Sequence, residues 1–231
     1  MNELVLLHGW GFSSEVWLPV TQYLATDWRV TLASMPGYGK PVLAGKDLPN
    51  NATICGWSLG GMQAMEWAIA HPDKVIRLVL VGTTPKFVEA PDWPHGQPAA
   101  VLDRFRLDVA ADPAVALRRF ASLLNRGDRL ARPLTRALNK LVDRSMPDAA
   151  TLNFGLSTLR NTDLRDKVAK IGQPVLIVHG EQDPMMPVAA GRWLAQNLPD
   201  SRLQVLADTA HAPFLAQPAA FARLLADFAH E

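Results

Sequence analysis

Cysteine is almost absent from this chain of 231 residues, which contains only Cys55. A single thiol cannot form an intramolecular disulfide, so a disulfide-stapled mini-protein is excluded and nothing requires an oxidising compartment. Long apolar runs are also missing, because His, Arg or Pro interrupts each of them before the roughly 18 residues that a membrane span needs. We therefore expect no transmembrane segment.

A basic leader and a charge excess are missing as well. The first residues, Met1-Asn2-Glu3, carry no positive side chain, and the apolar stretch 4–7 is much shorter than a signal-peptide core. The 23 basic and 22 acidic residues nearly balance, which argues against a globally basic nucleic-acid-binding protein. With 48% hydrophobic residues the chain is not disordered. These features predict a cytoplasmic, monomeric α/β protein that binds neither nucleic acid nor membrane.

Short apolar runs recur along the chain and have the length of buried strands. They cover residues 4–7, 30–33, 52–55, 78–81, 175–178 and 203–206. Helical patterns lie between them, at residues 60–70, 189–197 and 219–230. This alternation predicts an α/β fold with a mostly parallel, doubly wound sheet.

One long stretch, residues 89–170, contains helical periodicity but no convincing strand. We expect it to form a helical lid inserted into a core of residues 1–88 and 171–231, with Pro133 in the first turn of its second helix. Residues 114–144 contain eight basic and two acidic side chains. Arg136, Lys140 and Arg144 recur every four residues and form a stripe opposite the leucines. That stripe is either a docking face for an acidic partner or an ordinary solvated helix face.

The pentapeptide Gly56-Trp57-Ser58-Leu59-Gly60 lies between a predicted strand and a predicted helix. This is the context of a nucleophile elbow, where glycines two positions either side of the serine allow a sharp turn. The five residues alone are weak evidence, since chance produces them in some chains of this length. Their position between strand and helix makes Ser58 the candidate nucleophile.

His8-Gly9-Trp10-Gly11 directly follows the first predicted strand. A glycine-flanked turn at this place can direct a backbone N–H, here that of Trp10, at an oxygen that becomes negative during acyl transfer. The N–H of Leu59 would be the second donor. A plain tight turn is one alternative. A damaged dinucleotide fingerprint is another, although Ser14 replaces its last glycine and no acidic residue ends the next strand.

Two later segments complete a candidate triad. Asp183, in Gly180-Glu181-Gln182-Asp183, follows a predicted strand and can orient an imidazole, with Glu181 as the fallback and a solvated loop acid as the alternative. His211 lies in a loop after the last predicted strand, where a histidine suits the role of general base. The order Ser58, Asp183, His211 is the order of the α/β-hydrolase triad.

These segments resemble the α/β-hydrolase superfamily and, more closely, the pimeloyl-[acyl-carrier protein] methyl ester esterases of biotin synthesis. The resemblance extends over nearly the whole chain and includes words outside the catalytic motifs: Asp92-Trp93-Pro94, Arg119-Phe120, Ser145-Met146-Pro147, Thr162-Asp163-Leu164-Arg165 and Ala210-His211-Ala212-Pro213-Phe214. It implies a serine carboxylesterase that uses no metal and no organic cofactor and that acts on an ester carried by acyl-carrier protein. The implied triad is Ser58, Asp183 and His211.

The resemblance also implies residues that contact the substrate and the carrier. The substrate-binding positions are Trp10, Ser58, Leu59, His211 and the segment Phe120, Ala121, Ser122, Leu123 and Leu124, while Arg119, Arg132 and Arg136 fall where the family places arginines that hold the carrier protein. Phe120 could equally serve only to pack the lid. Three departures stand out: the chain begins at the oxyanion strand, residues 39–51 are about one helix short, and Val115 occupies a position where the family has an arginine.

We therefore expect a serine esterase acting through an acyl-enzyme. A small-ester hydrolase or lactonase without a carrier protein is the nearer rival, because a fold does not fix a substrate. A non-catalytic binding protein of hydrolase shape is the rival from another class. Dehalogenase and epoxide-hydrolase chemistry on this fold would place an aspartate at position 58.

Overall fold

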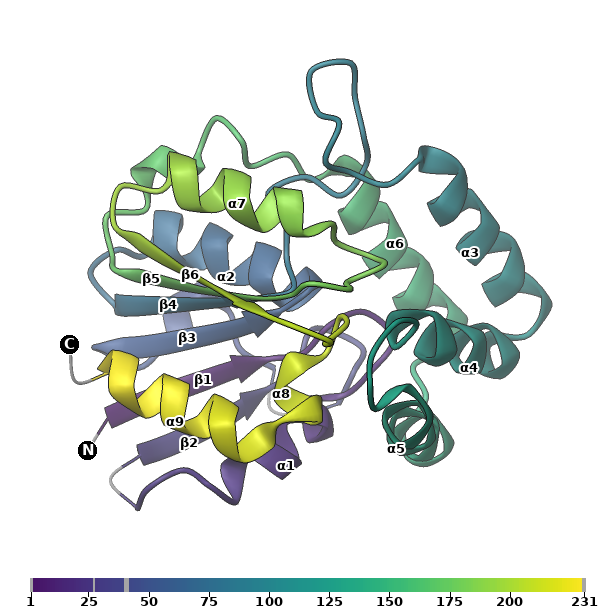
Figure 1. Ribbon diagram of the computed structural model, residues 1–231, viewed down its shortest axis with the longest axis horizontal. Helices are drawn as coiled ribbons and strands as arrows, with labels where there is room; N and C mark the ends of the chain where they lie inside the picture. Colours follow the sequence, from purple (N-terminus) through teal and green to yellow (C-terminus); the bar gives the residue numbers. More distant parts are fainter. Residues whose placement is uncertain (1, 27, 40–41, 230–231) are drawn as a thin grey trace.

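A computed structural model describes residues 2–26, 28–39 and 42–229 of the chain. Its centre is a six-stranded sheet with the strand order β2-β1-β3-β4-β5-β6 (Figure 1). Every neighbouring pair of strands is parallel. The sequence predicts a mostly parallel sheet, and the sheet is parallel throughout its described strands.

All six predicted strands are present, and each is longer than its apolar run. Their bounds are β1 Asn2–Leu7, β2 Trp28–Ala33, β3 Ala52–Trp57, β4 Val75–Val81, β5 Val175–Gly180 and β6 Ser201–Leu206. The central strands β3 and β5 are buried along their whole length. Helices cover both of their faces, so they lack the alternation of a half-exposed strand.

Helices pack on both faces of the sheet (Figure 1). One face is covered by α2 (Leu59–Ala70) and α7 (Val188–Asn197). The other is covered by α1 (Leu18–Thr21), α8 (Pro213–Ala216) and α9 (Pro218–Ala229). The predicted helix 219–230 corresponds to α9, except that residue 230 lies outside the described residues.

Four further helices follow β4 and precede β5: α3 (Ala99–Ala111), α4 (Pro113–Leu124), α5 (Ala131–Arg144) and α6 (Ala149–Asn161). They lie beyond the carboxyl ends of the strands (Figure 1). Pro133 is in the first turn of a helix, as predicted, but that helix, α5, is the third of this segment and not the second. The beginning of β1 and the end of α9 lie at the opposite side of the molecule from these helices. Active sites of parallel sheets form at the carboxyl ends of strands, so we expect the functional site between these ends and the four helices.

The connection from β2 to β3 contains, among its described residues, only the short 3-10 helix Gly45–Asp47. This agrees with the missing helix expected from the sequence. In the described sheet, β2 forms one edge and β6 the other. In the described part of the chain, no helix is both long and apolar enough to span a bilayer.

An ion-pair network supports the connection from β4 to α3. Arg165 binds both Asp163 and Asp92, and Lys86 binds Asp163 at 3.0 Å. The Arg165 guanidinium also lies 5.7 Å from the centre of the Trp93 ring. Hydrogen bonds from Arg165 hold the pKa of Asp163 well below its usual range. The segments Asp92-Trp93-Pro94 and Thr162-Asp163-Leu164-Arg165, which lie outside the catalytic motifs, therefore bind each other.

Candidate active site

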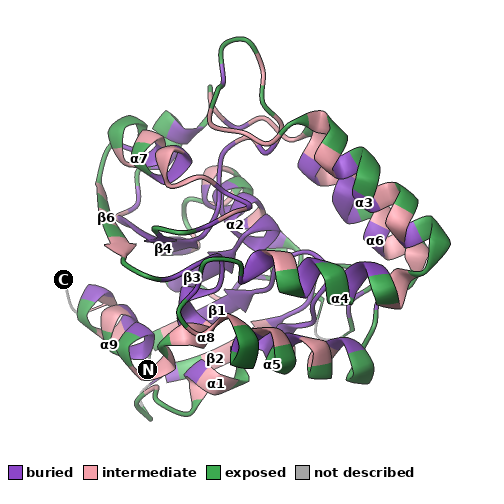
Figure 2. Ribbon diagram, turned by 45° about the vertical axis from the view of Figure 1, so that its right-hand side comes forward, coloured by how far each residue is buried: buried purple, intermediate pink, exposed green. Residues whose placement is uncertain are grey.

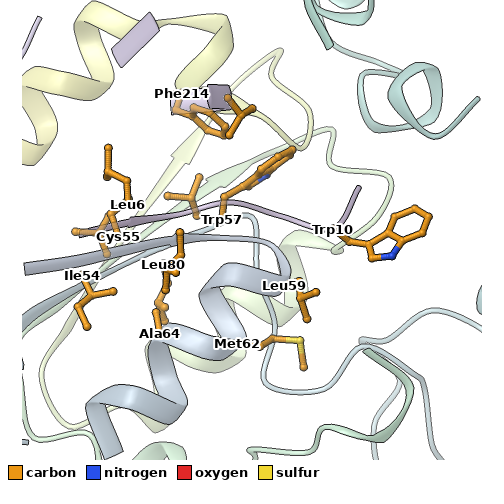
Figure 3. Packing of buried hydrophobic residues seen from close by; sticks show 14 of the residues in the cluster. Leu6, Trp10, Ile54, Cys55, Trp57, Leu59, Met62, Ala64, Leu80 and Phe214 are labelled. Carbon is orange, nitrogen blue, oxygen red and sulfur yellow. The ribbon is translucent and has the colours of Figure 1, made fainter. Parts of the chain in front are cut away.

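Ser58 occupies a sharp turn between β3 and α2. Its backbone has φ 56° and ψ −118°, a strained conformation for a residue with a side chain. A Cβ at Gly56 would lie 2.3 Å from the carbonyl oxygen of Gly60, and a Cβ at Gly60 would lie 2.4 Å from that of His8. Both glycines are therefore required by close packing of the turn. Figure 3 shows Trp57 on the side of Phe214 and Leu59 on the side of Met62.

The backbone of Ser58 is held from β4. Its N–H donates to the carbonyl oxygen of Val81 at 2.9 Å, and the Thr83 hydroxyl donates to the Ser58 carbonyl oxygen at 2.7 Å. These bonds join the turn to the neighbouring strand. They stabilise the positive φ that projects the serine side chain from the end of the sheet.

His211 and Asp183 form a buried hydrogen-bonded pair. Nδ1 of His211 lies 2.7 Å from Oδ2 of Asp183, and both side chains are almost completely inaccessible to water. The other oxygen of Asp183 accepts the N–H groups of Met185 and Met186. Donation from Nδ1 leaves Nε2 free to act as a base. Glu181, the fallback, is exposed to solvent.

Ser58 and His211 line the same small pocket, together with Trp10, Phe105 and Phe120. Its remaining walls are apolar: Phe87, Leu102, Leu156, Leu159, Met185 and Met186. The described residues show no hydrogen bond between the Ser58 hydroxyl and the His211 imidazole. The cavity measures about 10 Å³, which is at the lower limit for one water molecule. An acyl chain can enter only if these walls move apart.

The two backbone N–H groups predicted to form an oxyanion hole are those of Trp10 and Leu59. Leu59 is the first residue of α2, and Trp10 lies in the turn after β1. Within the described residues neither N–H has a hydrogen-bond acceptor. The amino end of a helix also carries a partial positive charge, which favours an anion near Leu59.

The turn that carries Trp10 is shaped by buried polar groups. Nδ1 of His8 donates to the Gly9 carbonyl oxygen at 2.8 Å, and Nε2 accepts the N–H of Met35 at 3.0 Å. Burial lowers the pKa of His8 to about 4, so the imidazole is neutral at pH 7. Gly11 has φ 82°, and a Cβ there would lie 2.6 Å from the Leu117 side chain. Helix α4 thus packs closely against this turn.

The Trp10 side chain forms one wall of the small pocket. Its Nε1 donates to the Leu152 carbonyl oxygen of α6 at 2.8 Å. Its ring stacks edge-on against Phe120 at 4.8 Å and lies 5.6 Å from Phe105. A Cβ at Gly155 would lie 2.5 Å from this ring. Both Trp10 and Phe120 therefore pack the helices and face the nucleophile at once.

The segment 120–124 divides between different surroundings. Phe120 lines the small pocket beside Ser58. Ser122 and Leu123 line a separate outer groove. Ala121 and Leu124 are fully buried and line neither space, although the Leu124 carbonyl oxygen accepts the N–H of His211. The predicted substrate contacts of Ala121 and Leu124 would therefore have to be indirect.

The outer groove has a volume of about 1120 Å³ and runs between α3, α4 and α5. Five arginines line it: Arg104, Arg119, Arg126, Arg132 and Arg136. Among the described residues of its lining, Asp108 is the only acidic one, and it pairs with Arg119 at 3.1 Å. The outer faces of α4 and α5 are exposed (Figure 2). The structure thus brings all three predicted arginines to one surface.

Phe105 lines both the outer groove and the small pocket. It is buried and lies edge-on to Phe120, with 5.3 Å between the ring centres. One aromatic side chain therefore separates the arginine-lined surface from Ser58. In the sequence, Phe105 is one of several apolar residues at helical spacing, a pattern that indicates only packing. Sequence reasoning therefore missed its position between the two cavities.

Sequence reasoning also missed His179 and Gln97. His179 is buried in β5, donates from Nε2 to the Met186 carbonyl oxygen at 2.7 Å, and lies 3.5 Å from Oδ2 of Asp183. Gln97 donates to the carbonyl oxygens of Pro184 and Met185. Both residues support the loop of Asp183. The partners of Gln97 are 87 and 88 positions away, so no local motif indicates its role.

Comparison with known proteins shows the family to which the chain belongs. A family model described as the alpha/beta hydrolase fold matches residues 44–218. A pimeloyl-[acyl-carrier protein] methyl ester esterase of Aromatoleum aromaticum is 43% identical over an alignment of 242 positions that covers 97% of each chain. A protein of the same name from Nitrosomonas europaea is 37% identical and matches over 95% of this chain and 92% of that one.

A solved esterase structure from Exiguobacterium antarcticum superposes with a TM-score of 0.89. The superposition covers 100% of this chain and 92% of the esterase, at 24% sequence identity. Similarity at that level of identity shows a shared fold, which is independent of the substrate.

Proposed function

Since the chain belongs to the α/β hydrolase family and, within it, to the pimeloyl-[acyl-carrier protein] methyl ester esterases, we propose that it hydrolyses the methyl ester of carrier-bound pimelate in biotin synthesis. The observation that carries this proposal is that His211, which forms a buried hydrogen bond with Asp183, lines the same pocket as Ser58. A carboxylic-ester hydrolase needs a nucleophile, a base and an orienting acid in this arrangement.

The first half of the reaction acylates Ser58. Its hydroxyl oxygen attacks the ester carbonyl carbon while Nε2 of His211 takes the hydroxyl proton. Asp183 holds the imidazole through Nδ1 and stabilises its positive charge. The N–H groups of Trp10 and Leu59 donate to the carbonyl oxygen as it becomes negative. His211 then protonates the departing methoxy group, and methanol leaves.

The second half releases the acid. A water molecule attacks the acyl-enzyme carbonyl carbon, and His211 takes one of its protons. The tetrahedral intermediate collapses, the Ser58 oxygen leaves, and His211 returns the proton to it. No metal or organic cofactor takes part in these steps.

The four helices α3–α6 are proposed to act as the lid, within the predicted insertion 89–170. The outer groove would bind an acidic carrier protein through Arg119, Arg132 and Arg136. The acyl chain would pass Phe105 to reach Ser58, because that side chain lies between the two spaces. A pocket of about 10 Å³ cannot hold the chain, so substrate entry requires the aromatic walls to separate.

The proposal is tested with the carrier-bound methyl ester and with a fluorophosphonate probe, which labels an activated serine. The wild-type protein is expected to hydrolyse the ester and to be labelled, whereas Ser58→Ala should do neither. Wild-type labelling no greater than that of Ser58→Ala would reject the serine-hydrolase function. Equal kcat/KM for the carrier-bound and the free methyl ester would favour the small-ester rival.

A further inference from the structure

Asp128 is a buried carboxylate in the connection between α4 and α5, with 7% of its surface exposed. Both of its oxygens accept backbone N–H groups. Oδ1 accepts the N–H of Leu130 at 2.7 Å, and Oδ2 accepts the N–H of Ala210 at 2.8 Å. The described residues provide no ion-pair partner for it. A buried charge is unfavourable without partners, so these two charge-assisted bonds account for its presence.

The two hydrogen bonds differ in how far apart along the sequence their partners lie. Leu130 is two residues away, and that bond only closes the turn before α5. Ala210 is 82 residues away and immediately precedes His211. The second bond therefore joins the four-helix segment to the loop that carries the candidate base.

Two neighbouring bonds extend this junction. The N–H of Arg129 donates to the Asp208 carbonyl oxygen at 3.0 Å, and the N–H of His211 donates to the Leu124 carbonyl oxygen at 3.3 Å. From the sheet side, Nε1 of Trp57 donates to the His211 carbonyl oxygen at 2.8 Å. The backbone around His211 is thus held between β3 and the α4–α5 connection.

We propose that Asp128 is a positioning residue for His211. Its carboxylate fixes the Ala210 N–H, and so keeps the loop where Nδ1 of His211 meets Asp183. This inference rests on the proposed role of His211 as the base. Because α4 and α5 also line the arginine groove, a shift of these helices would reach the histidine loop through this bond.

A purely structural role makes a different prediction. If Asp128 only closes the turn before α5, its removal would lower stability and leave turnover of a free ester unchanged. Asp112 provides a matched control, because its Oδ1 accepts the N–H groups of Ala114 and Val115 at the start of α4. It binds two backbone donors as Asp128 does, within the same helical segment and without contact to the histidine loop.

The experiment compares the hydrolysis of p-nitrophenyl butyrate, a free ester without a carrier protein, by Asp128→Ala, Asp128→Asn, Asp112→Ala and His211→Ala. We expect kcat of Asp128→Ala to fall at least about tenfold with KM within about twofold, since small misplacements of a catalytic group are costly. Its labelling by a fluorophosphonate should slow in proportion. Asp128→Asn, which keeps a single acceptor oxygen, should lie between Asp128→Ala and the wild type.

The control Asp112→Ala should lose thermal stability and keep the wild-type kcat. The proposal is overturned if kcat of Asp128→Ala equals that of Asp112→Ala at a temperature where both are folded. Should Asp128→Ala fail to fold, Asp128→Asn decides, and a wild-type kcat for it overturns the proposal. Wild-type turnover by His211→Ala would instead reject the proposed function.

Discussion

The indole N–H of Trp10 donates to the carbonyl oxygen of Leu152, 142 positions along the chain, at 2.8 Å. Trp10 lies in the turn after β1, and Leu152 lies in α6 of the four-helix segment. The backbone N–H that we assign to the oxyanion hole thus belongs to a residue whose side chain is bound to the four-helix segment. A shift of α6 would therefore be transmitted to the turn that carries this N–H.

Trp10→Phe keeps an aromatic ring but removes this bond. We expect the free energy of unfolding to fall by about 1 kcal/mol, the usual net value of one hydrogen bond. We also expect kcat for p-nitrophenyl butyrate to fall about tenfold, because full loss of an oxyanion donor costs on the order of 10² to 10³ and a displaced donor costs less. Urea denaturation and steady-state kinetics measure the two effects.

Trp93→Phe is the matched control for this prediction. It removes an equivalent bond, from Trp93 Nε1 to the Lys86 carbonyl oxygen at 3.0 Å, away from the pocket of Ser58. It should lower stability and preserve kcat. Identical kcat values for the two variants would show that the Trp10 bond has no influence on the reaction.

Charge reversal of the groove should separate carrier binding from chemistry. In the triple variant Arg119→Glu, Arg132→Glu and Arg136→Glu, we expect kcat/KM for the carrier-bound ester to fall at least about tenfold at low salt. The difference from the wild type should shrink as ionic strength rises, because salt screens exposed charges. Hydrolysis of p-nitrophenyl butyrate should remain within about twofold.

A second triple variant controls for net charge. Arg118, Lys140 and Arg144 lie on the same two helices but do not line the groove. Their replacement by glutamate changes the net charge equally and should reduce carrier-dependent turnover much less. Equal loss in both triple variants would mean that net charge, rather than this groove, attracts the carrier. Equal loss with the free ester would refute the carrier role altogether.

The buried His8 predicts how stability depends on pH. Its pKa is about 4 in the folded protein against an ordinary value of 6.5. Between these values the unfolded chain holds more protons at this side chain, so the free energy of unfolding decreases as the pH falls from 6.5 to 4. One proton corresponds to a slope of up to about 1.4 kcal/mol per pH unit.

Urea denaturation at several pH values from 4 to 7 measures this slope. His8→Asn should be less stable at pH 7 and should show a shallower slope than the wild type below pH 6.5. Some slope should remain, because burial also lowers the pKa of His179. Parallel slopes for His8→Asn and the wild type would contradict the assignment to His8.

The fold could be predicted because its signals are local. Each buried strand produces an apolar run, and the runs 52–55 and 175–178 fall inside β3 and β5. The predicted strands were shorter than the observed ones because polar or small residues occur at the strand ends. β4, for example, begins at Val75, but the predicted run begins only at residue 78, because the half-buried Arg77 interrupts the apolar pattern.

The candidate triad was also predictable, since Gly56 and Gly60 mark the elbow and the chain order places Asp183 and His211. Asp128 could not be found in this way. It looks like a surface acid in a basic segment, and its decisive partner, the Ala210 N–H, is supplied only by the fold. The same holds for Phe105, because helical spacing cannot distinguish a packing residue from one that separates two cavities.

The ends of the described chain have a practical consequence for work with a protein partner. β1 begins and α9 ends on the side of the molecule opposite the four helices (Figure 1). A purification tag, a fluorophore or a surface anchor joined at either end therefore starts away from the arginine-lined groove. The protein can be immobilised through a terminus with this surface facing the solution, where a partner as large as another folded domain has room to approach.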